Sequence, residues 1–190
     1  MGAIAAGDIV IYRVGDGNSA LSSASAAVFL DEYTTAGVLV QSIAVPTSIS
    51  GNNHALTAAG NSTAEGELSL SADGLYLIMA GYDAAAGTAA VATTTAAATN
   101  RVIGRVAVDG SIDSSTSLND VASGGNVRGA ASSNGTDFWI SASNGGIHYA
   151  TLGATTSTQI ENGTLNTRQV EIVGGNLYFS AATGSASAIT

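Results

Sequence analysis

The chain has 190 residues, a formal net charge of −9, no cysteine and five cationic side chains, all of them arginine. The lack of cysteine excludes disulfides, zinc–thiolate sites and cysteine nucleophiles, and the lack of lysine excludes Schiff-base chemistry and the Gly-x-x-x-x-Gly-Lys phosphate loop. Nucleic acid is not an expected partner, because its binding depends on many cations. No stretch reaches the roughly 18 consecutive apolar residues of a membrane span.

Short runs rich in β-branched and aromatic residues, separated by Gly, Asp and Asn, predict β-strands along the whole chain. In chain order we expect strands at 7–14, 27–33, 38–45, 67–71, 75–82, 101–108, 112–118, 128–133, 136–140, 147–152, 156–160, 168–173 and 176–179, and the start of another at 186–190. Pro46 ends the third run, because proline lacks the N–H that a strand ladder needs. Residues 83–100, mostly Ala, Thr and Gly, are expected to form an exposed loop. No helical period appears, so the predicted class is all-β.

One two-strand pattern occurs three times, at 67–78, 128–140 and 168–179, with an Asp-Gly, Asn-Gly or Gly-Gly turn in its middle. These dipeptides favour hairpins because they tolerate positive φ. The second and third turns lie 40 residues apart, and the loop at 83–100 explains the longer first interval. A repeat of about 40–45 residues is typical of a four-stranded β-propeller blade.

The predicted fold is therefore one partial β-propeller domain, 1–190, with a half-blade at 1–34 and blades at about 35–108, 109–152 and 153–190. Closed propellers have about four to eight blades, and closure removes their exposed edges. Three blades and a half make an incomplete ring. We expect another chain, or the missing half of a longer protein, to complete it.

Five segments carry a resemblance to a known group of proteins. They are residues 10–17 (Val-Ile-Tyr-Arg-Val-Gly-Asp-Gly), 29–33 (Phe-Leu-Asp-Glu-Tyr), 71–74, 128–131 and 152–159. In these segments the chain resembles secreted bacterial β-propeller proteins without assigned activity, and the resemblance runs nearly end to end. It implies a larger ring of about seven blades, exported from the cell, of which this chain is the N-terminal half. The group supplies no catalytic residues.

Arg128 and Arg168 lie 40 residues apart, at the same point of successive hairpins. In one interpretation they are ligand-binding residues, part of a ring of donors that holds a carboxylate or a sugar at the propeller mouth. In the other, each arginine joins neighbouring blades through carbonyls or an acidic partner.

Asp109 and Asp113 are the candidate metal ligands. Calcium takes about six to eight oxygens, and the pattern here lacks the spaced carboxylates of a strong site, so a hairpin turn is the alternative interpretation. No cofactor other than calcium is expected. The two imidazoles, His54 and His148, lie outside any spaced metal motif, and no Gly-x-Ser-x-Gly elbow is present.

The main functional hypothesis is an exported, non-enzymatic propeller at the cell surface or outside the cell. It would act as a binding or structural scaffold, with a glycan or a surface protein as partner. The N-terminus lacks a charged region followed by an apolar one, so either a signal peptide was removed before Met1 or there was none, and the export hypothesis favours removal. The alternatives are a lectin-like carbohydrate-binding module, a calcium-dependent propeller hydrolase, and a self-assembling fibre subunit or solenoid with open strand edges.

Overall fold

The computed structural model describes residues 2–162 and 166–182, and this part of the chain consists of antiparallel strands with one short 3₁₀ turn, η1 (Val91–Thr93). The strands are β1 (Ile9–Val14), β2 (Ser25–Ala26), β3 (Val28–Tyr33), β4 (Leu39–Ala44), β5 (Ala58–Ala59), β6 (Ser69–Leu70), β7 (Tyr76–Tyr82), β8 (Arg101–Ala107), β9 (Ile112–Leu118), β10 (Val127–Ser132), β11 (Asp137–Ala142), β12 (Ile147–Thr151), β13 (Thr158–Glu161), β14 (Thr167–Val173) and β15 (Asn176–Ala181). The all-β prediction is confirmed. The strand expected at 186–190 lies outside the described residues.

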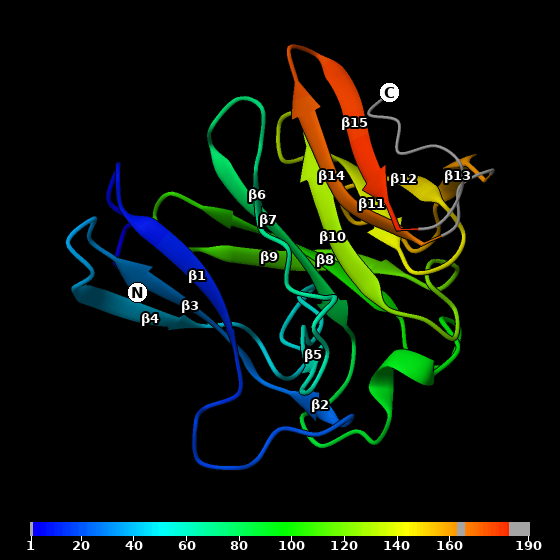
Figure 1. The fold of residues 1–190 in the computed structure, drawn as a ribbon, viewed down its shortest axis with the longest axis horizontal. Helices are drawn as coiled ribbons and strands as arrows, with labels where there is room; N and C mark the ends of the chain where they lie inside the picture. The colour runs from blue at the N-terminus through cyan, green and yellow to red at the C-terminus, as the bar shows by residue number, and fades with distance from the viewer. Residues whose placement is uncertain (1, 163–165, 183–190) are drawn as a thin grey trace.

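The strands form successive antiparallel sheets, none of which closes on itself within the described residues (Figure 1). The first has the order β1-β3-β4, the second β6-β7-β8-β9, the third β10-β11-β12-β13 and the last β14-β15, while β2 and β5 pair separately. The predicted hairpin between residues 101–108 and 112–118 is confirmed as β8 paired with β9. In the described part of the chain, no helix is long and apolar enough to cross a membrane.

The three repeated hairpins are confirmed as β6–β7, β10–β11 and β14–β15. Their turn residues Gly74, Gly135 and Gly175 have φ values of 76°, 77° and 79°. Residues with a Cβ rarely adopt this conformation, which is why the Asp-Gly, Asn-Gly and Gly-Gly dipeptides predicted the turns. Local turn chemistry therefore fixes where each pair of strands reverses.

Hydrophobic layers lie between consecutive sheets, because β7 sends alternate side chains to opposite faces. Ile78 joins a cluster with Leu118 and Phe138 between the second and third sheets. Met79 joins the other cluster, with Leu30 and other residues of the first sheet. A third, smaller cluster around Ala131, Ile147 and Val170 packs the β14–β15 hairpin onto the third sheet. Each sheet is thus packed face to face on the next.

The first strands of the last three sheets lie side by side, as the positions of β6, β10 and β14 in Figure 1 show. The N–H of Glu67 donates to the carbonyl of Arg128 (3.3 Å), and that of Ala72 donates to the carbonyl of Ser132 (2.9 Å). The hydroxyl of Ser69 also donates to the carbonyl of Ala130 (2.6 Å). Neighbouring sheets are therefore joined at these strands by hydrogen bonds as well as by apolar contact.

The loop expected at 83–100 is present and most of its residues are exposed or half-buried, but three of them are buried. Val91 and Ala96 are fully buried, and η1 packs near β5. Val91 packs in the apolar cluster of Ile78 and Phe138, and the guanidinium of Arg101 at the start of β8 donates to the carbonyls of Thr94 and Thr99. A run of Ala, Thr and Gly does not by itself indicate which of its residues will be buried.

Candidate binding site

Arg128, at the start of β10, is buried, with 4% of its surface exposed. One terminal nitrogen donates to the carbonyl of Ala64 (3.1 Å) and the other to Oδ1 of Asn166 (2.5 Å). These bonds join β10 to the segment before β6 and to the residue before β14, as the structural interpretation of this arginine expects. Burial lowers its pKa, and the charge of Arg168 lowers it further.

Arg168 is half-buried near the start of β14, and Glu67 lies just before β6. Burial raises the pKa of the Glu67 carboxyl, and the charges of Arg128 and Arg168 oppose that rise. The structure thus brings the two predicted arginines together around an acid that occupies the same position in the first hairpin. Because Glu67 is acidic and the two arginines are basic, the sequence does not reveal that the three residues occupy equivalent positions. One carboxyl group and two guanidinium groups at this place can join the three strands to one another, and they can also bind a polar ligand.

A second polar cluster, around Glu65, was missed by the sequence analysis. The Glu65 carboxylate accepts hydrogen bonds from the hydroxyl of Tyr82 (2.6 Å), the side-chain amide of Asn126 (2.5 Å) and the N–H of Ala59 (2.9 Å). Burial raises the pKa of Tyr82, and the neighbouring charge of Glu65 raises it further, so this phenol is a donor and not a base. The partners are up to 61 residues apart, which explains why spacing did not indicate them.

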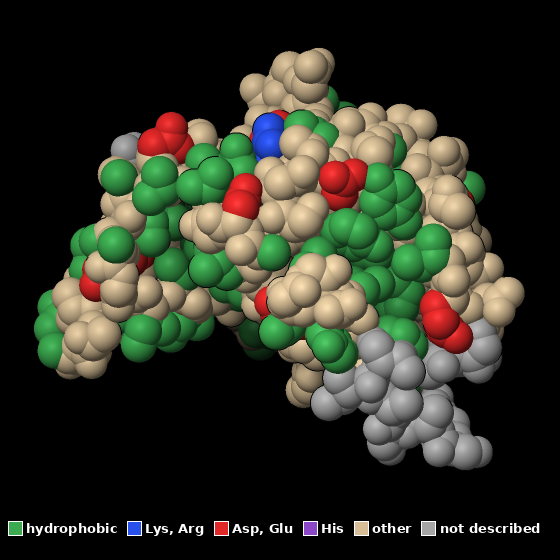
Figure 2. All heavy atoms as spheres, turned by 90° about the horizontal axis from the view of Figure 1, so that it is seen from above, with side chains coloured by type: hydrophobic (Ala, Val, Ile, Leu, Met, Phe, Trp, Pro, Cys, Tyr) green, Lys and Arg blue, Asp and Glu red, His purple; other side chains and the backbone are tan. Residues whose placement is uncertain are grey.

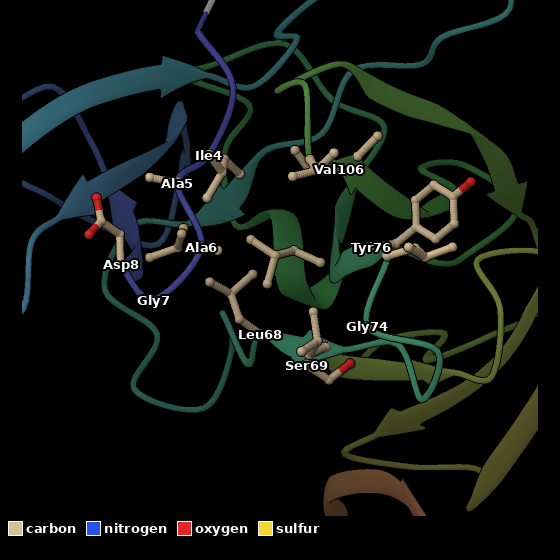
Figure 3. Close-up of a pocket in the computed structure, with 16 residues that line it drawn as sticks. Ile4, Ala5, Ala6, Gly7, Asp8, Leu68, Ser69, Gly74, Tyr76 and Val106 are labelled. Atoms are coloured by element: carbon tan, nitrogen blue, oxygen red, sulfur yellow. The ribbon is translucent and has the colours of Figure 1, made fainter.

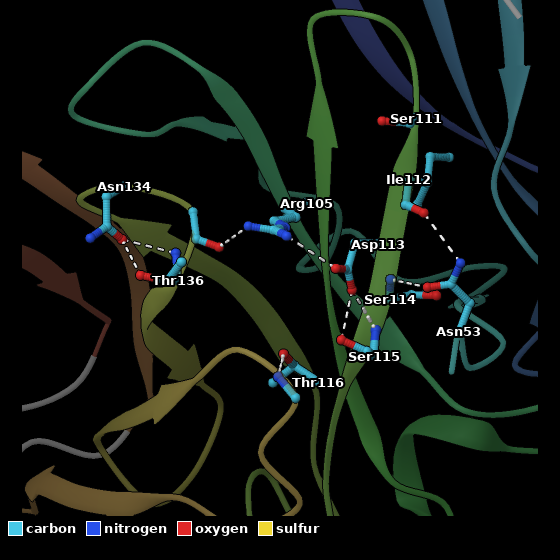
Figure 4. Close-up of polar contacts among 12 residues, drawn as sticks. Asn53, Arg105, Ser111, Ile112, Asp113, Ser114, Ser115, Thr116, Asn134 and Thr136 are labelled. Atoms are coloured by element: carbon cyan, nitrogen blue, oxygen red, sulfur yellow. Dashed lines mark hydrogen bonds and ion pairs between the residues drawn. The ribbon is translucent and has the colours of Figure 1, made fainter. Parts of the chain in front are cut away.

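Asp109 and Asp113 each accept hydrogen bonds from a nearby serine, and Figure 4 shows those of Asp113. Asp109 accepts from the N–H (2.9 Å) and hydroxyl (2.6 Å) of Ser111. Asp113 accepts from the N–H (3.0 Å) and hydroxyl (2.7 Å) of Ser115, and its other oxygen accepts from Arg105 (3.2 Å). Burial raises the pKa of Asp113, but these bonds and the Arg105 charge outweigh it and leave the pKa lowered. Among the residues that the structure describes, no three His, Asp or Glu side chains are placed to hold a metal ion.

A polar pocket of about 260 Å³ lies beside Asp113. Its lining includes Tyr76, Arg105 and Ser111. Arg105 lies 5.0 Å from the centre of the Tyr76 ring, and it donates to the carbonyl of Gly135 (2.9 Å) across the turn of the third sheet. The pocket therefore offers a carboxylate, a guanidinium and a hydroxyl at the junction of two sheets.

The two histidines make separate contacts and do not form one site. Nδ1 of His54 lies 2.7 Å from the Asp83 carboxylate. Nδ1 of His148 lies 2.7 Å from the hydroxyl of Ser157, which lies 3.0 Å from the Asp120 carboxylate. In a nucleophilic triad the histidine lies between serine and acid. Here the serine lies between the other two groups, so its hydroxyl is not activated as a nucleophile by a His–Asp pair.

An apolar cleft of about 440 Å³ lies between the N-terminal segment and strands β6–β8 (Figure 3). Ile4, Ala5 and Ala6 form one wall, and side chains from the second sheet, including Leu68 and Val106, form the other. A volume of this size lies within the range of small-molecule sites. No sequence motif indicated it, because its two walls are separated by about sixty residues of chain.

Comparison of the chain with protein-family models, with curated proteins and with solved structures finds no match in any of the three.

Proposed function

We propose that the chain is part of a β-propeller and that it serves as an exported, non-enzymatic binding or scaffold module. The observation that carries this proposal is the succession of antiparallel sheets in chain order, each packed face to face on the next, with the first strands β6, β10 and β14 side by side. In a propeller the first strand of each blade lines the common axis. Export is supported by the acidic, lysine-free composition and by the resemblance to secreted propellers.

The outer face of the first sheet supports the idea that a further chain segment completes the ring. Ile9, Ile11 and Leu39 point to the face opposite the Leu30 cluster, and about half of each residue's surface is exposed. Figure 2 shows hydrophobic side chains distributed over the face seen from above, with acidic groups between them. Exposed apolar patches on a sheet face are typical of interaction surfaces.

The mass of the particle in solution tests this proposal. We expect a particle heavier than one chain in light scattering coupled to size exclusion at micromolar concentration. Ile11→Asp should lower that mass, because a carboxylate cannot be buried at an apolar interface without large cost. Ile49→Asp is the matched control, since Ile49 is exposed outside the first sheet. A monomer for the wild-type chain, or the same mass for both variants, would overturn the idea that a second chain completes the ring.

The polar pocket beside Asp113 favours a second candidate, a carbohydrate-binding role. Arg105, Ser111 and Asp113 supply both donors and acceptors, as neutral sugars require. Titration calorimetry with neutral mono- and disaccharides should show heat that Arg105→Met abolishes and Arg13→Met preserves. No heat with the folded wild-type chain would remove this candidate.

A further inference from the structure

The first sheet has three strands, whereas the second and the third have four each. The chain passes from the last strand of one sheet to the first strand of the next, from β9 to β10 and from β13 to β14. It passes in the same way from β4 to β6, with only β5, which pairs with β2, between them. β4 therefore corresponds to β9 and β13, and β1 corresponds to the second strands β7 and β11. Within residues 2–162 and 166–182, no first strand pairs with β1.

The register of the β1–β3 ladder shows which backbone groups of β1 face this open edge. Val14 lies opposite Val28, and in the next pair the N–H of Gly15 donates to the carbonyl of Ala27 (2.7 Å). Bonded and unbonded pairs alternate in an antiparallel ladder. Every second residue of β1 therefore directs its N–H and C=O groups away from β3, and these residues are Val10, Tyr12 and Val14.

The open edge of β1 lies beside β6. A Cβ on Gly66, just before β6, would lie 2.8 Å from Cδ1 of Tyr12, and Val10 and Leu70 line the same cleft. In the part of the chain that the structure describes, no residue forms a hydrogen bond with the N–H and C=O groups at this edge. The surface of Leu70 is 54% exposed. An edge strand with unpaired backbone groups beside apolar side chains is a template for pairing with another strand.

We propose that this edge binds an extended segment of a partner polypeptide as a fourth strand, antiparallel to β1 as β6 is to β7. An extended backbone fits because it presents N–H and C=O groups on one edge about every 6.8 Å, the spacing of alternate residues in β1. Backbone hydrogen bonds hold the segment, and its alternate apolar side chains cover Leu68 and Leu70 of β6. The inference rests on the proposed function, in which a further segment completes the ring, and it names the kind of partner and the strand that receives it.

Hydrogen exchange of single amides, followed in ¹H–¹⁵N correlation spectra, tests the open edge in the chain alone. The amides of Val10, Tyr12 and Val14 should exchange at least about tenfold faster than those of Ile11 and Arg13, which bond to β3. The five residues belong to one strand, so fraying of β1 affects all of them and leaves this alternation visible. Equally slow exchange at all five would overturn the proposal, because a segment of the same chain or of a second copy would then already occupy the edge.

A peptide with the sequence of β14, Thr-Arg-Gln-Val-Glu-Ile-Val, is the probe, because β14 is the first strand of its own sheet and its central residues alternate between polar and apolar. At saturation it should slow exchange at the three edge amides by about tenfold or more and leave Ile11 and Arg13 unchanged. The same peptide with N-methyl groups on its fourth and fifth residues loses one N–H on each edge and keeps every side chain. It should bind at least about tenfold more weakly.

Two pairs of variants locate the bound peptide. Val10→Pro should weaken binding about tenfold or more, whereas Ala44→Pro, which removes an N–H from the opposite edge of the same sheet, should not. Leu70→Ser should also weaken binding, whereas Leu39→Ser, a change of an equally exposed leucine in β4, should not. The spectra show whether each variant is folded.

An unchanged exchange rate of the edge amides when the peptide is added to the folded wild-type chain would overturn the proposal. Equal binding of the N-methylated peptide would do the same, because the backbone would then not be the group recognised. The mass of the particle is measured without peptide and depends on the outer face of the first sheet. Failure at the edge is therefore distinguishable from failure of the proposed function.

Discussion

Arg101 is the residue whose replacement tests most directly how long-range polar contacts hold this fold together. Its side chain is completely buried, and its described hydrogen-bond partners are all uncharged oxygens. They include the carbonyls of Thr94 (2.7 Å) and Thr99 before β8, and that of Ala122 (2.7 Å) after β9. The guanidinium also lies 4.9 Å from the centre of the Tyr82 ring. Burial lowers the pKa of this guanidinium.

Two opposing effects decide how much Arg101→Met lowers the free energy of unfolding. Each hydrogen bond from a charged donor contributes about 1.5–3 kcal/mol, and three strong ones would give roughly 5–9 kcal/mol. Methionine carries no charge, so the variant avoids the several kcal/mol that desolvation of the buried guanidinium costs the folded state. The carbonyls of Thr94 and Ala122 also keep backbone donors, from Gly124 and Gly125. We therefore expect a net loss of about 3 kcal/mol, which lowers the melting temperature by roughly 6–12 °C for a chain of this size.

Urea unfolding followed by Trp139 fluorescence measures this loss, and hydrogen exchange locates it. Exchange should accelerate most in residues 83–100 and 119–126, the two segments that Arg101 joins to the sheet. Arg13→Met is the control for location, because the described hydrogen bonds of this arginine all go to residues of the first sheet or to Gly15 beside it, so faster exchange should appear there and not in residues 83–100 and 119–126. If Arg101→Met unfolds at the wild-type urea concentration, or if exchange rises evenly along the chain, the contacts of this guanidinium do not hold the two segments.

Three further predictions concern the third sheet. Gly146→Ala should destabilise the fold by at least about 2 kcal/mol more than Gly174→Ala in urea unfolding. Both glycines have positive φ, but only a Cβ at Gly146 would meet another atom, the carbonyl oxygen of Glu161 at 1.9 Å. Equal losses of stability would contradict this prediction. Phe138→Ala should cost about 3–5 kcal/mol by the same assay, since the ring is fully buried between two sheets, and a loss below about 1 kcal/mol would show that the ring adds little to the core. Burial lowers the pKa of His148, so the folded state binds fewer protons than the unfolded state. Stability should therefore fall as the pH drops below the ordinary histidine pKa of about 6.5. His148→Gln should reduce this slope, and an unchanged slope would exclude the histidine as its source.

How much of this fold the sequence could predict depends on the range of the interaction involved. The hairpins follow from neighbouring residues, because a Gly with positive φ and alternating side chains suffice to define a turn and two strands. Arg128 and Arg168 stood out because a repeat places equal residues at equal positions. Glu67 occupies the same position with the opposite charge, so it did not stand out, although its carboxyl lies within the electrostatic reach of both arginines.

The contacts that could not be predicted are those that join distant segments. The Glu65 carboxylate binds Tyr82 and Asn126, and Arg101 binds carbonyls on both sides of its own sheet. Nothing in a single sequence indicates which of several polar residues will be buried together after folding. The apolar cleft belongs to the same class, because it exists only where the N-terminal segment crosses the second sheet.

Part of the Gly and Ala content of the chain allows neighbouring segments to approach closely. A Cβ on Gly129 of β10 would lie 2.8 Å from the Cβ of Glu67, and one on Gly81 of β7 would lie 2.6 Å from the carbonyl oxygen of Thr57. Beside Gly129, the buried Ala130 and Ala131 face the neighbouring sheets on either side. Backbones that come this near leave room only for hydrogen or methyl side chains. Small residues at these positions therefore allow close contact, whereas sixteen other glycines of the described residues have positive φ, as those of the hairpin turns do.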